Sequence, residues 1–168
     1  MIGDASNYSS NLDFVEQIPN QTGLLPNDRT HVFKFSGSYR FQFGLTFGTL
    51  VSLQSGTPIS ELGSTPMGAP WFIFLSERGS VRRTPAIFNI DLRLTYKPTR
   101  IANSRFNYKI ILDMMNLTNE KTAVTFEEIH FFRVDENGNQ ASPNPNFGKP
   151  ASYRAPLTVR LGFEVGFD

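Results

Sequence analysis

The sequence contains no cysteine in its 168 residues, which excludes disulfide bonds and thiolate metal centres. It has no apolar stretch approaching the roughly 18–20 consecutive residues of a membrane-spanning helix. Its formal net charge is only +1, so no concentrated basic face is available to follow a phosphate backbone. Residues 1–14 also lack the basic start and apolar centre of a signal peptide. A nucleic-acid partner is therefore not expected, and no stretch of this sequence is predicted to form a membrane-spanning helix.

Aromatic residues are abundant, at 13% of the chain with 16 phenylalanines, as in β-rich proteins whose side chains cover pleated surfaces. Five segments alternate between apolar and polar residues, and none shows comparable helical periodicity. In the clearest segment, Leu92 and Leu94 flank Arg93. The alternation predicts five two-faced β-strands. They cover residues 30–42, 45–54, 87–97, 105–117 and 157–167.

The connections between these segments alternate between short and long. Segments 30–42 and 45–54 are joined around Phe43-Gly44, and segments 87–97 and 105–117 are joined by residues 98–104. Residues 55–86 and 118–156 instead form long connections. Structureless loops beyond about 12–15 residues are rare in compact soluble domains. Outer-membrane barrels combine short periplasmic turns with long extracellular loops. The pattern therefore predicts an all-β fold, namely a five-stranded segment of an antiparallel up-and-down transmembrane β-barrel that is open on its own.

The polar faces of the predicted strands carry charges of both signs, which suits a wet lumen where charges pair across strands. These residues are Lys34, Arg40, Asp91, Arg93, Lys109, Asp113, Arg160 and Glu164. Aromatic residues gather at the short-turn end, where an interfacial girdle would lie. Alternation alone also fits a soluble β-barrel that binds a small apolar ligand inside, or a sandwich.

Two groups of residues in the last long connection could bind a metal ion. Glu127, Glu128 and His130 offer carboxylate and imidazole ligands, although such a group is more typical of solvated polar surface. Asp135, Asn137 and Asn139 have the every-second-residue spacing of a calcium loop, without its glycine and distal glutamate in register. Asn137-Gly138 is first of all a hairpin turn signal.

Three arginines in the preceding long connection, Arg78, Arg82 and Arg83, are candidate contacts for an anionic ligand. For Arg83 a structural ion pair is the favoured alternative. The sequence has no cysteine, no serine in a nucleophile elbow and no phosphate-cradling glycine loop. Neither an enzymatic activity nor a cofactor is expected.

Five stretches, in order, resemble TonB-dependent receptors, the plugged transporters of bacterial outer membranes. They are LPNDRTHVFKFSGSYRFQFGL (25–45), SGTP (55–58), RTPAIFNIDLRLTYK (83–97), DMMNLTNEK (113–121) and NFGKPASYRAPLTVRLGFEVGF (146–167). The likeness is strongest to receptors that begin with a carboxypeptidase-regulatory-like domain. It implies that residues 1–168 are the carboxyl-terminal portion of such a barrel, with its last five strands.

The resemblance also implies a function and partners. The intact receptor would actively import a large or scarce ligand, which the sequence does not name. Its partners would be outer-membrane lipid, the rest of the barrel with its plug domain, and the barrel-assembly machinery. The family's plug and TonB-contacting box have no counterpart here, so the TonB complex would be reached only through a missing amino-terminal part. Because a barrel must be exported, we expect either an internal Met1 or a signal removed with upstream sequence.

In this family the final strand is the one that the assembly machinery recognises, which implicates Phe163, Val165 and Phe167 as the assembly signal. Asp168 departs from the usual terminal aromatic residue. An alternative of another functional class is a structural or adhesive surface barrel without transport.

Overall fold

The computed structural model describes residues 18–65, 71–98, 106–135 and 137–167. Within these ranges the chain forms strands and no helix, in two compact units. We call His31–Ser55, Ala86–Thr122 and Arg154–Asp168 the sheet unit, and Met1–Thr30, Gly56–Pro85 and Ala123–Tyr153 the loop unit. The described part of the chain thus offers no helix that could cross a membrane. Asp168 and residues 99–105 of the second short connection lie outside the described residues.

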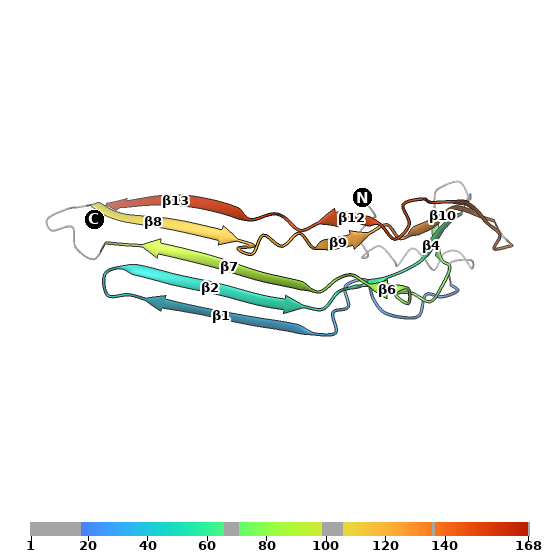
Figure 1. Ribbon diagram of the computed structural model, residues 1–168, viewed down its shortest axis with the longest axis horizontal. Coiled ribbons are helices and arrows are strands. Elements are labelled where there is room, and N and C mark those ends of the chain that lie inside the picture. The colour runs from blue at the N-terminus through green and yellow to red at the C-terminus, as the bar shows by residue number, and fades with distance from the viewer. Residues whose placement is uncertain (1–17, 66–70, 99–105, 136, 168) are drawn as a thin grey trace. The chain divides into compact units, whose positions relative to one another are not determined.

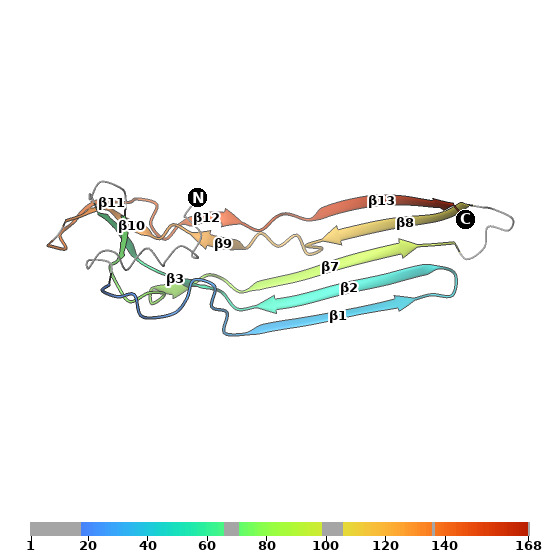
Figure 2. The same ribbon diagram turned by 180° about the vertical axis from the view of Figure 1, so that it is seen from behind.

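The sheet unit consists of five long strands, ordered β1-β2-β7-β8-β13, with every neighbouring pair antiparallel (Figures 1 and 2). The strands are β1 (Val32–Arg40), β2 (Leu45–Gln54), β7 (Ile87–Tyr96), β8 (Phe106–Met115) and β13 (Thr158–Phe167). Each strand falls within one of the five predicted segments. The predicted all-β fold with antiparallel sheets is therefore confirmed, while closure into a barrel and membrane insertion stay predictions.

The short turn between β1 and β2 is present where the sequence places it. The Phe41 amide donates to the Leu45 carbonyl at 2.7 Å, and the Gly44 amide donates to the Phe41 carbonyl at 3.1 Å. Gly44 has a φ of 94°, a backbone conformation that is easy only for glycine. The Lys97 amide then donates to the Gly44 carbonyl at 2.9 Å, which links this turn to the end of β7.

The long connections were expected to be loops without secondary structure. This expectation is corrected, because they form short strands of their own in the loop unit. These strands are β3 (Pro58–Ile59), β4 (Leu62–Thr65), β5 (Trp71–Phe74), β6 (Arg82–Arg83), β9 (Ala123–Phe126), β10 (Ile129–Val134), β11 (Gln140–Pro143) and β12 (Pro150–Tyr153). They build the sheets β11-β10-β4-β5, β12-β9 and β3-β6, in which β10 and β4 run parallel. Strands this short carry too few residues for a sustained alternation, so the sequence pattern does not reveal them.

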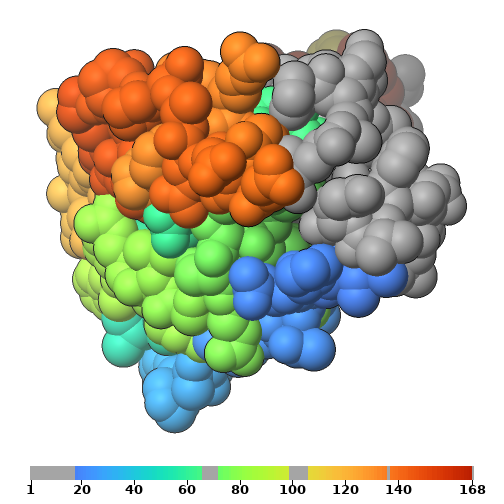
Figure 3. Space-filling model, turned by 90° about the vertical axis from the view of Figure 1, so that its right-hand side faces the viewer, coloured from blue at the N-terminus to red at the C-terminus, as the bar shows by residue number. Residues whose placement is uncertain are grey.

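The buried hydrophobic side chains of the described residues all belong to the loop unit. They are Ile59, Leu62, Phe74, Ala123 and Val134. Figure 3 shows this unit from its end, with segments of residues 71–85 in green, 123–153 in orange and 18–30 in blue. The sheet unit has the opposite character. Its buried residues include Ser52, Asp113 and Asn116, which are polar.

Candidate functional site

The apolar face of the five-stranded sheet is continuous across all five strands. Tyr39 lies opposite Phe47, which lies opposite Leu94, and the row continues through Leu112 to Leu161. No bulge shifts the register of these pairs, and the next row of this face carries Gly37 and Thr49 before it continues through Leu92 and Met114 to Val159. Large side chains of this face remain in contact with solvent: Phe33, Phe35, Tyr39, Phe47, Leu53, Phe88, Tyr96, Phe106, Ile110, Val159, Leu161, Phe163, Val165 and Phe167. An apolar patch of this extent marks a surface that contacts a protein, a ligand or a membrane.

The opposite face pairs its charges. One row joins Ser38, Gly48, Arg93, Asp113 and Arg160 across the five strands. Arg93 Nε donates to Asp113 Oδ1 at 2.5 Å and its Nη2 donates to Asp113 Oδ2 at 3.0 Å. Lys109 Nζ lies 2.8 Å from Glu164 Oε2. All members of this row except Ser38 line an open hollow, in which glycine at position 48 leaves room beside the ion pair. The predicted cross-strand pairing of the polar-face charges is thus present for these two pairs.

In the loop unit, Arg83 connects three of the sequence motifs. Its Nη2 lies 2.5 Å from Asp28 Oδ2, and its Nη1 donates to the Asp28 and Gly56 carbonyls at 3.1 and 2.8 Å. The structure therefore places Arg83 in the structural ion pair that the sequence favoured. Thr57 and Thr84 are joined by two hydrogen bonds beside it. The Thr84 amide donates to the Thr57 carbonyl at 2.8 Å, and the Thr57 amide donates to the side-chain Oγ1 of Thr84 at 2.9 Å.

The other two arginines also have intramolecular partners. Arg78 Nη2 donates to the Gly23 carbonyl at 3.3 Å. Arg82 Nη2 donates to the Gly148 carbonyl, and its guanidinium carbon lies 4.8 Å from the centroid of the Phe126 ring. The three guanidinium groups thus hold different segments of the loop unit. Their role as ligand contacts stays a prediction.

The acidic and histidine residues around position 128 make contacts within the loop unit. Glu128 Oε1 accepts a hydrogen bond from the Ser60 amide at 2.9 Å, and Glu127 Oε1 accepts one from the Ile129 amide at 3.0 Å. Burial raises the pKa of the Glu128 carboxyl, partly offset by the Ser60 amide and reinforced by the charge of Glu127. His130 Nδ1 lies 2.5 Å from Glu61 Oε1. Among the described residues no group of three or more His, Cys, Asp or Glu side chains is placed to hold a metal ion.

Asp135 organises the β10–β11 turn. Its Oδ1 accepts hydrogen bonds from the Asn137 and Asn139 amides at 2.9 and 2.8 Å, and its Oδ2 accepts one from Asn139 Nδ2 at 2.7 Å. The bonds from the Asn139 side chain and amide hold the pKa of the Asp135 carboxyl below its usual range. Gly138 follows with a φ of 80°, so the hairpin turn expected at Asn137-Gly138 is present.

The residues implicated in assembly lie along the solvent-exposed edge strand β13. Phe163, Val165 and Phe167 face Ile110, Tyr108 and Phe106 of β8, respectively. The Phe167 ring meets Phe106 edge-on at a centroid distance of 5.1 Å and remains 74% exposed. The assembly role itself stays a prediction.

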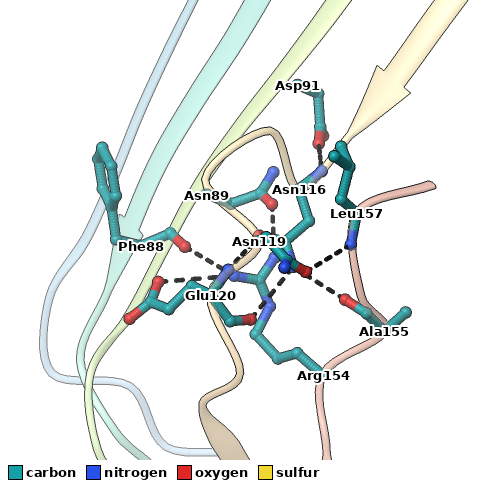
Figure 4. Close-up of polar contacts among 9 residues, drawn as sticks. All are labelled: Phe88, Asn89, Asp91, Asn116, Asn119, Glu120, Arg154, Ala155 and Leu157. Atoms are coloured by element: carbon teal, nitrogen blue, oxygen red, sulfur yellow. Dashed lines mark hydrogen bonds and ion pairs between the residues drawn. The ribbon is translucent and has the colours of Figure 1, made fainter. Parts of the chain in front are cut away.

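Sequence reasoning missed one polar cluster, which joins Asn116 and Arg154 with neighbouring residues at the end of the sheet (Figure 4). Asn116 is 4% exposed and makes side-chain hydrogen bonds to Glu120 and Ala155. Both central residues fall inside motifs that resemble the receptor family. These motifs were the signal that could have drawn attention to the two residues. Their contacts span up to 66 positions of sequence, so the motifs do not show which residues they meet.

Comparison with known proteins gives one informative similarity. The chain is 29% identical over 196 residues to the TonB-dependent transporter Oar of Myxococcus xanthus. The aligned region covers 96% of this chain and 18% of the transporter, so the chain spans about a fifth of that relative's length. No family model matches the chain. No solved structure matches it either.

Proposed function

We propose that this chain forms part of the barrel wall of a TonB-dependent outer-membrane receptor, with its apolar face toward lipid and its polar face toward the lumen. The observation that carries the proposal is the facing of the sheet. One row is apolar across all five strands and the large side chains of this face stay uncovered, while the opposite face pairs Arg93 with Asp113 and Lys109 with Glu164. A soluble sandwich or barrel would instead bury that apolar face in its core. The similarity to Oar supports the same family.

Finer statements extend this proposal. The segment would supply the carboxyl-terminal strands of the barrel, in a receptor of the carboxypeptidase-regulatory-like subgroup. The intact receptor would import a large or scarce ligand by active transport rather than catalyse a reaction. The loop unit would lie outside the cell and contribute to ligand capture. The plug domain, the TonB complex and the barrel-assembly machinery would be its partners. Upstream sequence encoding a plug and a TonB box would distinguish this transporter from a structural or adhesive barrel.

The facing is tested by single cysteines in the protein expressed at its full encoded length, since the chain itself contains no cysteine. Leu92→Cys and Leu94→Cys should react with a maleimide dissolved in the lipid phase of isolated membranes. Arg93→Cys should not react, because its side chain lies on the polar face. Thr95→Cys is the matched control on that face, because it leaves the Arg93–Asp113 ion pair in place.

Labelling of Arg93→Cys and Thr95→Cys without labelling of the two leucine positions would reverse the inside and outside of the sheet. Absence of all four variants from the membrane fraction, with the protein monomeric in solution, would favour the soluble β-barrel instead.

A further inference from the structure

No tight turn fixes the register in which strand β13 pairs with β8. It pairs with β8 from Thr158 opposite Met115 to Phe167 opposite Phe106. In a hairpin the turn sets the register, but here residues 116–157 separate the two strands. This connection includes part of the loop unit, Ala123–Tyr153. Its length alone therefore does not select one register.

The hydrophobic pattern of β13 excludes only some of the alternatives. A slip by one residue would move every apolar side chain to the polar face. A slip by two residues would keep Val159, Leu161, Phe163, Val165 and Phe167 on the apolar face. The Lys109–Glu164 pair opposes such a slip, but its side chains are 38% and 63% exposed, and ion pairs this exposed contribute little. Another element must distinguish between registers that differ by two.

We infer that the polar cluster centred on Asn116 and Arg154, which we call the entry clamp, sets the register of β13 on β8. Asn116 directly follows β8, and its Nδ2 donates to the Ala155 carbonyl at 2.9 Å. Asn119 Oδ1 accepts a hydrogen bond from the Leu157 amide at 3.1 Å. The residues that lead into β13 are thus bonded to the residues that leave β8 (Figure 4).

Arg154 anchors the clamp to the sheet. Its Nη1 donates to the Phe88 carbonyl at 2.6 Å, and its Nη2 donates to Asn89 Oδ1 at 2.5 Å, both at the start of β7. Its backbone amide donates to the Thr122 carbonyl at 3.0 Å. The Arg154 side chain is 16% exposed, so water competes weakly for these bonds.

The residues that directly follow β8 are also hydrogen-bonded to the sheet. The Asn116 amide donates to Asp91 Oδ1 at 2.9 Å, and the Leu117 amide donates to the Ile90 carbonyl at 2.8 Å. Asn116 Oδ1 accepts from the Glu120 amide at 3.2 Å, while Asn116 Nδ2 also donates to the Glu120 carbonyl at 3.1 Å. A slip by two residues would move Leu157 by about 7 Å along the strand. That displacement would break the bonds to Asn116 and Asn119 together, and the clamp therefore recognises one register.

The test uses disulfide formation in the protein expressed at its full encoded length. Leu161→Cys is combined with Leu112→Cys, its partner in register, or with Ile110→Cys or Met114→Cys, its partners after a slip by two. Directly opposite side chains are close enough for a disulfide, whereas diagonal ones are about 7–8 Å apart and are not. With the clamp intact, only the pair with Leu112→Cys should cross-link efficiently under mild oxidation.

Adding Asn116→Ala and Arg154→Ala should raise the cross-linking of the Ile110→Cys or Met114→Cys pair by about tenfold or more, because each lost hydrogen bond shifts an equilibrium by about a factor of five. Arg82→Ala is the matched control. It also removes an arginine bonded to a backbone carbonyl, but within the loop unit, and should leave the cross-linking pattern unchanged.

Asn119→Ala is a milder variant that removes the side-chain bond to Leu157 and places alanine at a φ of 50°, and it should give a smaller shift in the same direction. Wild-type cross-linking in both the double variant and Asn119→Ala would overturn the inference. Loss of all cross-links in the double variant together with wild-type cross-linking in Asn119→Ala would also overturn it, because the cluster would then act on stability and not on register.

Discussion

Arg93 on β7 and Asp113 on β8 form a two-point ion pair, with the Nε–Oδ1 contact at 2.5 Å and the Nη2–Oδ2 contact at 3.0 Å. The Arg93 side chain is 65% exposed, whereas the Asp113 side chain is only 11% exposed. The carboxylate is therefore shielded from water on a face where this guanidinium is its closest cation. Charge pairs of this geometry position two strands as well as stabilise them.

Because Asp113 is shielded, we expect the Arg93–Asp113 pair to have a larger coupling energy than the Lys109–Glu164 pair of the same face. A double-mutant cycle with Arg93→Leu and Asp113→Asn should give a clear coupling energy in urea unfolding of the detergent-solubilised protein. The same cycle with Lys109→Met and Glu164→Gln should give a smaller one, because both side chains of that pair are substantially exposed. Equal coupling in the two cycles would contradict the importance that we assign to the shielded Asp113.

The close approach of Gly56 to Thr84 in the loop unit predicts that a side chain at position 56 is destabilising. A Cβ at position 56 would lie 1.6 Å from the Thr84 carbonyl oxygen, so Gly56→Ala should separate Thr57 from Thr84. We expect a destabilisation of about 3 kcal/mol or more, seen as faster proteolysis between residues 56 and 85. At Gly48 the nearest atom is 3.8 Å away, and Gly48→Ala is therefore the tolerated control. Equal protease resistance of both variants would contradict this close approach.

Glu128 predicts a pH dependence of the loop unit. Burial raises its pKa above the ordinary value of 4.5, so the folded state holds the proton more tightly than the unfolded state. Its favourable contribution is complete below pH 4.5 and is lost as the pH rises through the raised pKa. Glu128→Gln keeps an acceptor for the Ser60 amide, and should stabilise the loop unit at neutral pH but not at acidic pH. The measurement is protease resistance of the two proteins across this pH range, and a gain that does not change with pH would contradict the prediction.

Phe167 predicts a defect in assembly. Phe167→Ser removes the aromatic contact with Phe106 and an exposed apolar side chain at the end of the edge strand. We expect less heat-modifiable folded barrel in the outer membrane, measured by electrophoresis of unheated samples. Deletion of Asp168 is the control and should leave assembly unchanged. Normal assembly of Phe167→Ser together with failure of the deletion would show that the end of the strand is misplaced.

The uncovered apolar face predicts the behaviour of the 168-residue chain expressed alone. It should be recovered from inclusion bodies or as aggregates, because β1 and β13 each have one neighbour among the described strands and leave an open edge. Light scattering after transfer into detergent-free buffer measures this. A monodisperse monomer under those conditions would rule out the membrane-facing assignment.

The sequence by itself determined where the five long strands lie and which side chains share a face. This information is local, because a strand places alternate residues on opposite sides whatever its partners are. For β2 the predicted and observed bounds agree, and the other four strands fall within their predicted segments. The turn at Asn137-Gly138 was readable for the same reason, since residues within a few positions of each other determine it.

The tertiary structure decided what depends on distant partners. The sequence favoured a structural ion pair for Arg83, but only the fold identified its partner as Asp28, 55 positions away. Glu128 was an ordinary surface carboxylate until Ser60 and burial changed its environment. The register of β13 is the clearest case, because a slip by two residues leaves every side chain on the same face. We infer that the contacts of Asn116 and Arg154 with residues far along the chain distinguish between these registers, and no local pattern encodes such contacts.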